Sequence, residues 1–174
     1  MSHQSQLEFV ARVKQRFPQY FKNRRVLEIG SLDINGSVRQ FFDDCDYTGV
    51  DLGEGKGVDY VGRGEELTYP DDNFCVTISC ECFEHNPEWI RTFNNMVRMT
   101  SGLVIMTCAT TGRPEHGTRR TSPSDAPFCG DYYQNLTEHD IKSSCNMSRF
   151  VEYEFSTNAN PADLYFWGLI CRQS

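Results

Sequence analysis

Short apolar runs separated by polar loops dominate the chain, and their spacing predicts its secondary structure. Five runs have the length and the β-branched or aromatic content of buried strands. They cover residues 26–29, 47–51, 58–61, 74–79 and 103–108. Apolar residues at helical spacing predict an amphipathic leading helix over about residues 5–22 and a second helix over residues 87–99.

The end of the chain follows a different pattern. Two apolar runs, residues 150–155 and 164–171, are separated by a turn at residues 158–161. Consecutive strands joined in this way form an antiparallel hairpin, whereas strands that alternate with helices form a parallel sheet. The sequence therefore predicts a single α/β domain over residues 1–174: a Rossmann-like, doubly wound, mostly parallel seven-stranded sheet with an antiparallel edge hairpin at the C-terminus.

Composition and charge narrow the classes of partner. The chain has 24 acidic and 17 basic residues and a net charge of -7, whereas a nucleic-acid-binding face needs a surplus of Lys and Arg. No apolar run reaches the roughly 20 residues that span a bilayer, and the first residues do not resemble a signal peptide. We therefore expect a cytoplasmic protein without a nucleic-acid or membrane partner.

The cysteines suggest packing rather than metal binding. None of the eight forms a C-x-x-C pair, and several lie within apolar runs, where a free thiol behaves as a small hydrophobic group. We expect reduced, buried thiols and predict no metal site.

A ligand site is predicted where the first strand ends. The strand stops at Gly30, and a polar loop leads through Gly36 to Ser37, a plausible helix N-cap. A strand, a glycine-containing loop and a helix N-terminus let a cofactor approach the backbone closely. Asp51 ends the second strand about 20 residues after Gly30, where an acid accepts hydrogen bonds from a ribose diol. Glu28 lies within the apolar strand, and burying a carboxylate there favours a functional role.

A long polar segment, residues 109–136, interrupts the regular alternation after the fifth strand. Loops of this length in a compact domain are usually functional or disordered. Its aromatic residues, among them Phe128, Tyr132 and Tyr133, indicate an ordered segment. We predict a lid or substrate-binding loop.

Taken in order, these motifs resemble a known family. They are VLEIG at residues 26–30, then Gly36, GVD at residues 49–51, PDDNF at residues 70–74 and ISCECFEH at residues 78–85. Together they resemble the class I S-adenosylmethionine-dependent methyltransferases, in particular their small type 11 branch. The resemblance covers roughly residues 25–108, and the closing strands also fit that fold.

The resemblance implies roles for individual residues in binding S-adenosylmethionine. Glu28 would orient the methionyl amine, while Gly30 and Ser31 let the loop backbone approach the cofactor. Asp51 would bind the ribose hydroxyls, with Leu52 beside the adenine.

Past the fourth strand, Cys80 and Glu81 would line the methionyl side. The sequence departs from the family at Leu32 and Ile34, which replace glycines, and at Arg63, where the family often has an acid that binds the adenine amine. Either Glu65 or backbone groups would bind the adenine amine instead.

The chemistry that the resemblance implies is in-line displacement of an activated methyl group by an O or N nucleophile. A hydroxyl nucleophile also needs a base. His116, in the loop after the fifth strand, titrates in the useful range and is the first candidate; Glu115, Tyr132 and Tyr133 are the others. The polar loop favours a small polar acceptor, such as a sugar or a nucleotide-linked sugar.

Two other functions stay open at this point. A glycine loop followed by a ribose-binding acid also serves nicotinamide-dependent oxidoreductases, although the three-glycine G-x-G-x-x-G fingerprint is missing. The departures at Leu32, Ile34 and Arg63 leave open a binding module that keeps the methyltransferase fold without turnover.

Overall fold

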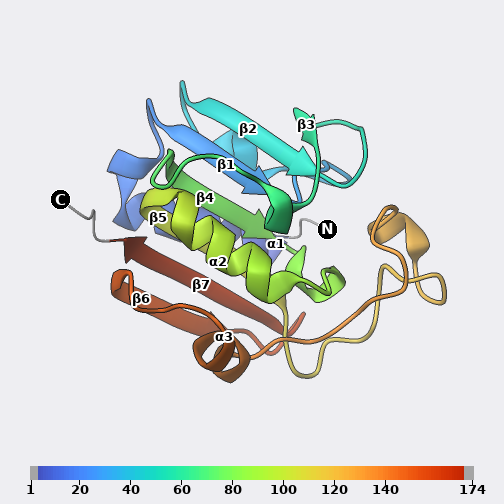
Figure 1. Cartoon of the computed structure of the whole chain (residues 1–174). Coiled ribbons are helices and arrows are strands. Elements are labelled where there is room, and N and C mark those ends of the chain that lie inside the picture. Colours follow the sequence, from blue (N-terminus) through green and yellow to red (C-terminus); the bar gives the residue numbers. More distant parts are fainter. Residues whose placement is uncertain (1–3, 171–174) are drawn as a thin grey trace.

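The structure is a computed structural model that describes residues 4–170. Its centre is a seven-stranded sheet with strand order β3-β2-β1-β4-β5-β7-β6 (Figure 1). The strands are β1 (Arg25–Ile29), β2 (Asp46–Asp51), β3 (Tyr60–Val61), β4 (Phe74–Cys80), β5 (Thr100–Ala109), β6 (Phe150–Thr157) and β7 (Asp163–Ile170). The helices are α1 (Gln4–Arg16), α2 (Trp89–Met99) and α3 (Glu138–Ser144).

The pairing of the strands confirms the predicted fold class. The first five strands pair in parallel, β7 runs antiparallel to β5, and β6 pairs antiparallel with β7. The chain leaves β1 toward β2 on one side and later returns to β4 on the other. This reversal creates a crevice at the carboxyl ends of β1 and β4, where open sheets of this kind bind ligands.

Helices cover the two faces of the sheet and bury two apolar clusters (Figure 1). Successive side chains of a strand point to opposite faces, so Val26 packs in the cluster on the α1 side while Leu27 packs on the α2 side. On α1 the buried apolar residues are Phe9, Val10 and Val13.

Two predicted helices are shorter than expected. The leading helix ends at Arg16 rather than near residue 22, and a separate 3-10 turn covers Pro18–Tyr20. Proline disfavours helical geometry in the residue before it, which explains this boundary. The helix expected after Ser37 is a single 3-10 turn, Val38–Phe41, although Ser37 does cap it by accepting a hydrogen bond from the Arg39 N–H.

Other boundaries differ by a few residues. The third strand comprises Tyr60–Val61 alone, because the preceding glycine-rich segment forms turns. The helix predicted from residue 87 starts at Trp89. The end of the last predicted strand, Cys171, lies outside the described residues, and the seven cysteines within them are free thiols. None of the helices in the described part of the chain is long and apolar enough to cross a membrane.

Candidate functional site

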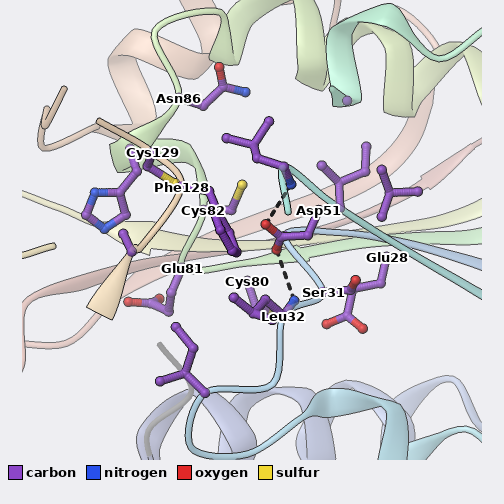
Figure 2. Close-up of a pocket in the computed structure, with 18 of the residues that line it drawn as sticks. Glu28, Ser31, Leu32, Asp51, Cys80, Glu81, Cys82, Asn86, Phe128 and Cys129 are labelled. Carbon is purple, nitrogen blue, oxygen red and sulfur yellow. Dashed lines mark hydrogen bonds between the residues drawn. The ribbon is translucent and has the colours of Figure 1, made fainter. Parts of the chain in front are cut away.

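A cavity of about 220 Å³ opens at the carboxyl ends of β1, β2 and β4. Figure 2 shows Glu28 and Asp51 toward one side of it and Glu81 and Cys129 toward the other. The segment Asp125–Cys129 also lines it, so the predicted lid contributes part of the wall.

All of the predicted cofactor-binding residues line this one cavity. They are Glu28, Gly30, Ser31, Gly36, Asp51, Leu52, Glu65, Cys80 and Glu81. They come from four separate segments of the chain, and the sheet topology brings them together.

Asp51 connects the loops that follow β1 and β2. One carboxylate oxygen accepts a hydrogen bond from the Leu32 N–H at 3.0 Å, and the other accepts one from the Leu52 N–H at 2.7 Å (Figure 2). Burial raises the pKa of this carboxyl, and the two N–H donors oppose that shift. A carboxylate oxygen has a second lone pair, so the fixed carboxylate can still accept bonds from a diol.

The loop after β1 keeps its shape without the glycines that the family usually has. Gly30 has φ +82°, and a Cβ there would lie 2.6 Å from the Cβ of Cys82, so only glycine fits. The Asp33 carboxylate accepts a hydrogen bond from the Gly36 N–H at 2.8 Å and pairs with Lys56 at 2.6 Å. Leu32 packs where a Cβ on Gly55 would lie, 2.3 Å from the added atom. Side-chain contacts thus order this loop.

Glu28 is a buried carboxylate with one side-chain donor. The Tyr47 hydroxyl donates a hydrogen bond to it at 2.7 Å. Burial raises the pKa of Glu28 to about 7, against the lowering effect of Tyr47 and of the Arg39 charge. Its charge is therefore adjustable near neutral pH, as expected of a group that meets a cation.

Glu65 lies beneath the predicted adenine end of the cavity. Its carboxylate accepts a hydrogen bond from the Thr92 hydroxyl at 3.2 Å and is 3.6 Å from the Arg63 guanidinium. Thr92 in turn accepts a hydrogen bond from the Asn86 amide at 2.8 Å, and Asn86 itself lines the cavity. Glu65 and Asn86 are both placed to contact a ligand here.

The end of β4 carries backbone strain. Glu81 has φ +53°, a conformation that costs a non-glycine residue free energy and is often found at functional sites. It is held there because its N–H donates to the Thr107 carbonyl at 2.9 Å and its carboxylate accepts from the Thr107 hydroxyl at 2.9 Å. Burial raises the pKa of the preceding Cys80 thiol to about 12, so this thiol stays protonated at neutral pH.

The four predicted catalytic residues do not line the cavity. Glu115 accepts a hydrogen bond from Thr118 at 2.7 Å, and the Tyr132 hydroxyl donates to Gln134. Tyr133 donates to the carbonyl of Pro114 at 3.1 Å and to Asn135 at 2.9 Å. These contacts order the lid. The sequence could not show this, because the lid contributes to the wall through a different stretch, Asp125–Cys129.

His116 lies behind the cavity wall, in contact with His85. The centroids of the two imidazole rings are 5.1 Å apart, and the Tyr133 ring packs against both. His85 itself lines the cavity. Glu84 completes this group, with a carboxylate oxygen 4.0 Å from His116 Nε2. Burial lowers the pKa of His85 to about 4 and raises that of Glu84, which the nearby Glu81 charge raises further.

Sequence reasoning missed several residues of the cavity wall, among them His85, Asn86, Phe128 and Cys129. For His85 a signal existed, since it follows the fourth strand within the motif that carried the resemblance. Phe128 and Cys129 lie in a segment without periodicity, so the sequence did not indicate which of its residues turn inward.

The parallel sheet, with an antiparallel β7 inserted between β5 and β6 and with this crevice, has the class I fold of S-adenosylmethionine-dependent methyltransferases. Solved structures that match it with probability 1.00 include methyltransferases of this kind. Neither a protein-family model nor a curated protein sequence matches.

Three of these structures illustrate the range. Phosphoethanolamine N-methyltransferase 2 of Haemonchus contortus, in complex with S-adenosylmethionine, is 15% identical with a TM-score of 0.67; the match covers 95% of this chain and 52% of that one. The 1,6-didemethyltoxoflavin-N1-methyltransferase of Burkholderia thailandensis is 13% identical (TM-score 0.64, 95% and 77% covered). A methyltransferase of Archaeoglobus fulgidus is 14% identical (TM-score 0.62, 94% of each chain covered). The chain thus spans about half the length of the nematode enzyme.

Proposed function

We propose that this protein is an S-adenosylmethionine-dependent methyltransferase that methylates an O or N nucleophile of a small polar acceptor. The observation that carries the proposal is the Asp51 carboxylate, fixed at the end of β2 by two backbone N–H groups and facing the cavity. This is the geometry that a ribose diol requires. Structures of similar fold that contain S-adenosylmethionine or S-adenosylhomocysteine support the choice of cofactor.

The positions of the other residues suggest how the cofactor lies. With its ribose on Asp51, the adenine extends toward Leu52 and Glu65, and the methionyl end toward Glu28 and Cys80. Glu28 then accepts hydrogen bonds from the ammonium group, which compensates the cost of its buried charge.

The acceptor would enter between Glu81 and the lid. Polar side chains of the wall here include Glu81, His85 and, from the lid, Asp125, and they suit a hydroxyl or amine better than an apolar substrate. The protein's contribution to the rate is mainly to hold the nucleophile in line with the sulfonium methyl and exclude water. His116 does not line the cavity, so we assign it no direct contact with the acceptor.

Calorimetric titration with S-adenosylhomocysteine and with NADH tests the proposal. We expect binding of the former, and at least ten-fold weaker binding to Asp51→Asn, because hydrogen bonds to a charged acceptor contribute about 1.5–3 kcal/mol. The control is Glu54→Gln, an exposed carboxylate three residues further along that does not line the cavity; its affinity should equal that of the unmodified protein.

The alternatives predict different results. Binding of NADH without binding of S-adenosylhomocysteine would replace the methyltransferase with an oxidoreductase. The non-catalytic module would be favoured if the protein binds S-adenosylhomocysteine but transfers no methyl group to any of a panel of sugars, nucleotide sugars and amines.

A further inference from the structure

A buried polar cluster beside the cavity lacks the partners that buried polar groups normally have. Both carboxylate oxygens of Glu84 and the Nδ1 of His85 are buried, and none has a hydrogen-bond partner among residues 4–170. Burial raises the pKa of this carboxyl, and the backbone N–H groups of Glu84 itself and of Ala109 lower it with a smaller, opposite effect. A carboxylate buried in this way is costly unless a proton or a cation compensates it.

The three side chains converge on one point. One ligand atom of each of Glu84, His85 and His116 lies within 4.8 Å of the others. Ligand atoms around a tetrahedral Zn²⁺ with bonds near 2.1 Å are about 3.4 Å apart. The separations of the ligand atoms are therefore at most about 1.4 Å longer than those of a coordinating arrangement.

The state of His116 is the one that a metal needs. Its Nδ1 is 3.1 Å from the carbonyl oxygen of Pro114, which can only accept, so Nδ1 carries the proton and Nε2 presents its lone pair toward Glu84. A backbone carbonyl that fixes the ring in this way is the usual outer partner of a metal-bound histidine.

Lid backbone and cavity wall are closely fitted at this point. Gly117 has φ +64°, and a Cβ there would lie 2.7 Å from Cε1 of His85. The glycine after His116 thus allows the lid to pack directly on the His85 ring.

We propose that Glu84, His85 and His116 form a binding site for one divalent first-row transition-metal ion that fastens the lid to the wall of the cavity. Two imidazoles and one carboxylate suit Zn²⁺, Fe²⁺, Mn²⁺ or Co²⁺. Three protein ligands leave at least one coordination position open, and His85 places the ion next to the cavity. The sequence predicted no such site, because the ligands are histidines and a glutamate rather than paired cysteines.

Co²⁺ binding to the chelator-treated protein tests the proposal, because visible absorption counts the ion and an ultraviolet thiolate charge-transfer band reveals cysteine ligands. This distinction matters, since three thiols are nearby: burial and, to a smaller extent, the Glu84 charge raise the pKa values of Cys82, Cys108 and Cys129. We expect one Co²⁺ per chain without a charge-transfer band, and at least ten-fold weaker binding to His116→Ala and to Glu84→Gln.

The control is His139→Ala, an exposed histidine of α3 that is not part of the cluster; it should bind Co²⁺ like the unmodified protein. If the buried Glu84→Gln variant does not fold, the Co²⁺ affinity of His116→Ala alone tests the proposal. Circular dichroism can show that this lid variant is folded. Unchanged Co²⁺ affinity in His116→Ala, or a charge-transfer band in the unmodified protein, overturns the proposal. The proposed metal site does not rest on the proposed methyl transfer. Titration with S-adenosylhomocysteine tests the cofactor site and Co²⁺ titration tests the metal site, so the failure of one proposal can be told from the failure of the other.

Discussion

Two carboxylates beside the same cavity, the partly buried Asp51 and the buried Glu84, differ in how their surroundings compensate them. Burial raises the pKa of both. Asp51 accepts two backbone hydrogen bonds, from Leu32 and Leu52, whereas neither oxygen of Glu84 has a hydrogen-bond partner among the described residues. Asp51 is therefore ready for a neutral ligand that donates hydrogen bonds, while Glu84 needs a cation or a proton.

The difference follows from the segments that supply each group. Asp51 lies where two parallel strands end, and the sheet register brings backbone N–H groups to it. Glu84 lies under the lid, whose contacts with the wall are made by single residues such as Gly117. The first region should therefore be rigid and sensitive to any added atom, and the part of the lid away from Gly117 more tolerant.

Glycine substitution should produce the largest contrast between the two regions. A Cβ on Gly49 of β2 would lie 2.2 Å from the carbonyl oxygen of Gly57, so the segment of residues 55–59 must move. The two hydrogen bonds that join Gly49 and Asp59 must then lengthen. We expect Gly49→Ala to lower the free energy of unfolding by about 3 kcal/mol, measured by urea denaturation.

The matched lid variant is Gly130→Ala. An added Cβ meets nothing within 4 Å there, and only the φ of +71° opposes it, at a cost of about 1 kcal/mol. Equal losses in the two variants would show that the strand ends are no less tolerant than the lid.

The pH dependence of cofactor binding should be the next largest effect. Glu28 has a pKa of about 7 in the folded protein, raised from its ordinary value of 4.5 by burial. Because the proposed pairing with the ammonium group requires the carboxylate, affinity for S-adenosylhomocysteine should rise about ten-fold between pH 6 and pH 8. The stability of the ligand-free fold should change in the opposite sense, falling as the pH rises from 4.5 through 7, since the raised pKa favours the protonated form.

Glu28→Gln removes this titration while keeping the shape of the side chain. Its affinity for S-adenosylhomocysteine should be low and vary less than three-fold over the same pH range, measured calorimetrically in buffers of matched ionic strength. A ten-fold rise in the variant as well would assign the pH dependence to another group.

Regular periodicity explains how much of the fold the sequence could predict. Strands such as β4 and β5 are continuous apolar runs, and the hairpin of β6 and β7 is separated by a turn, so class and strand pairing followed from the pattern. The ends of the helices were harder to predict, because they depend on local effects such as that of Pro18 on the residue before it. The cofactor side of the site was predictable for the same reason, since Glu28 and Asp51 lie on predicted strands and strand ends fix where side chains point.

The positions of the lid residues could not be predicted in this way. Its residues have no period, and their positions depend on tertiary contacts such as the ion pair of Arg113 with the buried Asp163 at 2.9 Å. The choice of His116, Glu115, Tyr132 and Tyr133 rested on residue type and on their place in the loop after the fifth strand. The structure places Phe128 and Cys129 at the cavity instead.

Phe128 connects the two regions, and its substitution should give the smallest of these effects. Its ring packs on Gly53, where an added Cβ would lie 2.4 Å from it, and the side chain remains 47% exposed. Since only part of the ring is buried, we expect Phe128→Ala to weaken S-adenosylhomocysteine binding by about 1 kcal/mol, or five-fold. Tyr153→Ala, a partly exposed aromatic of β6 away from the cavity, should leave this affinity unchanged. Tighter binding by Phe128→Ala would mean that the ring occupies the place of the cofactor, so that the lid competes with the strand-end region instead of completing it.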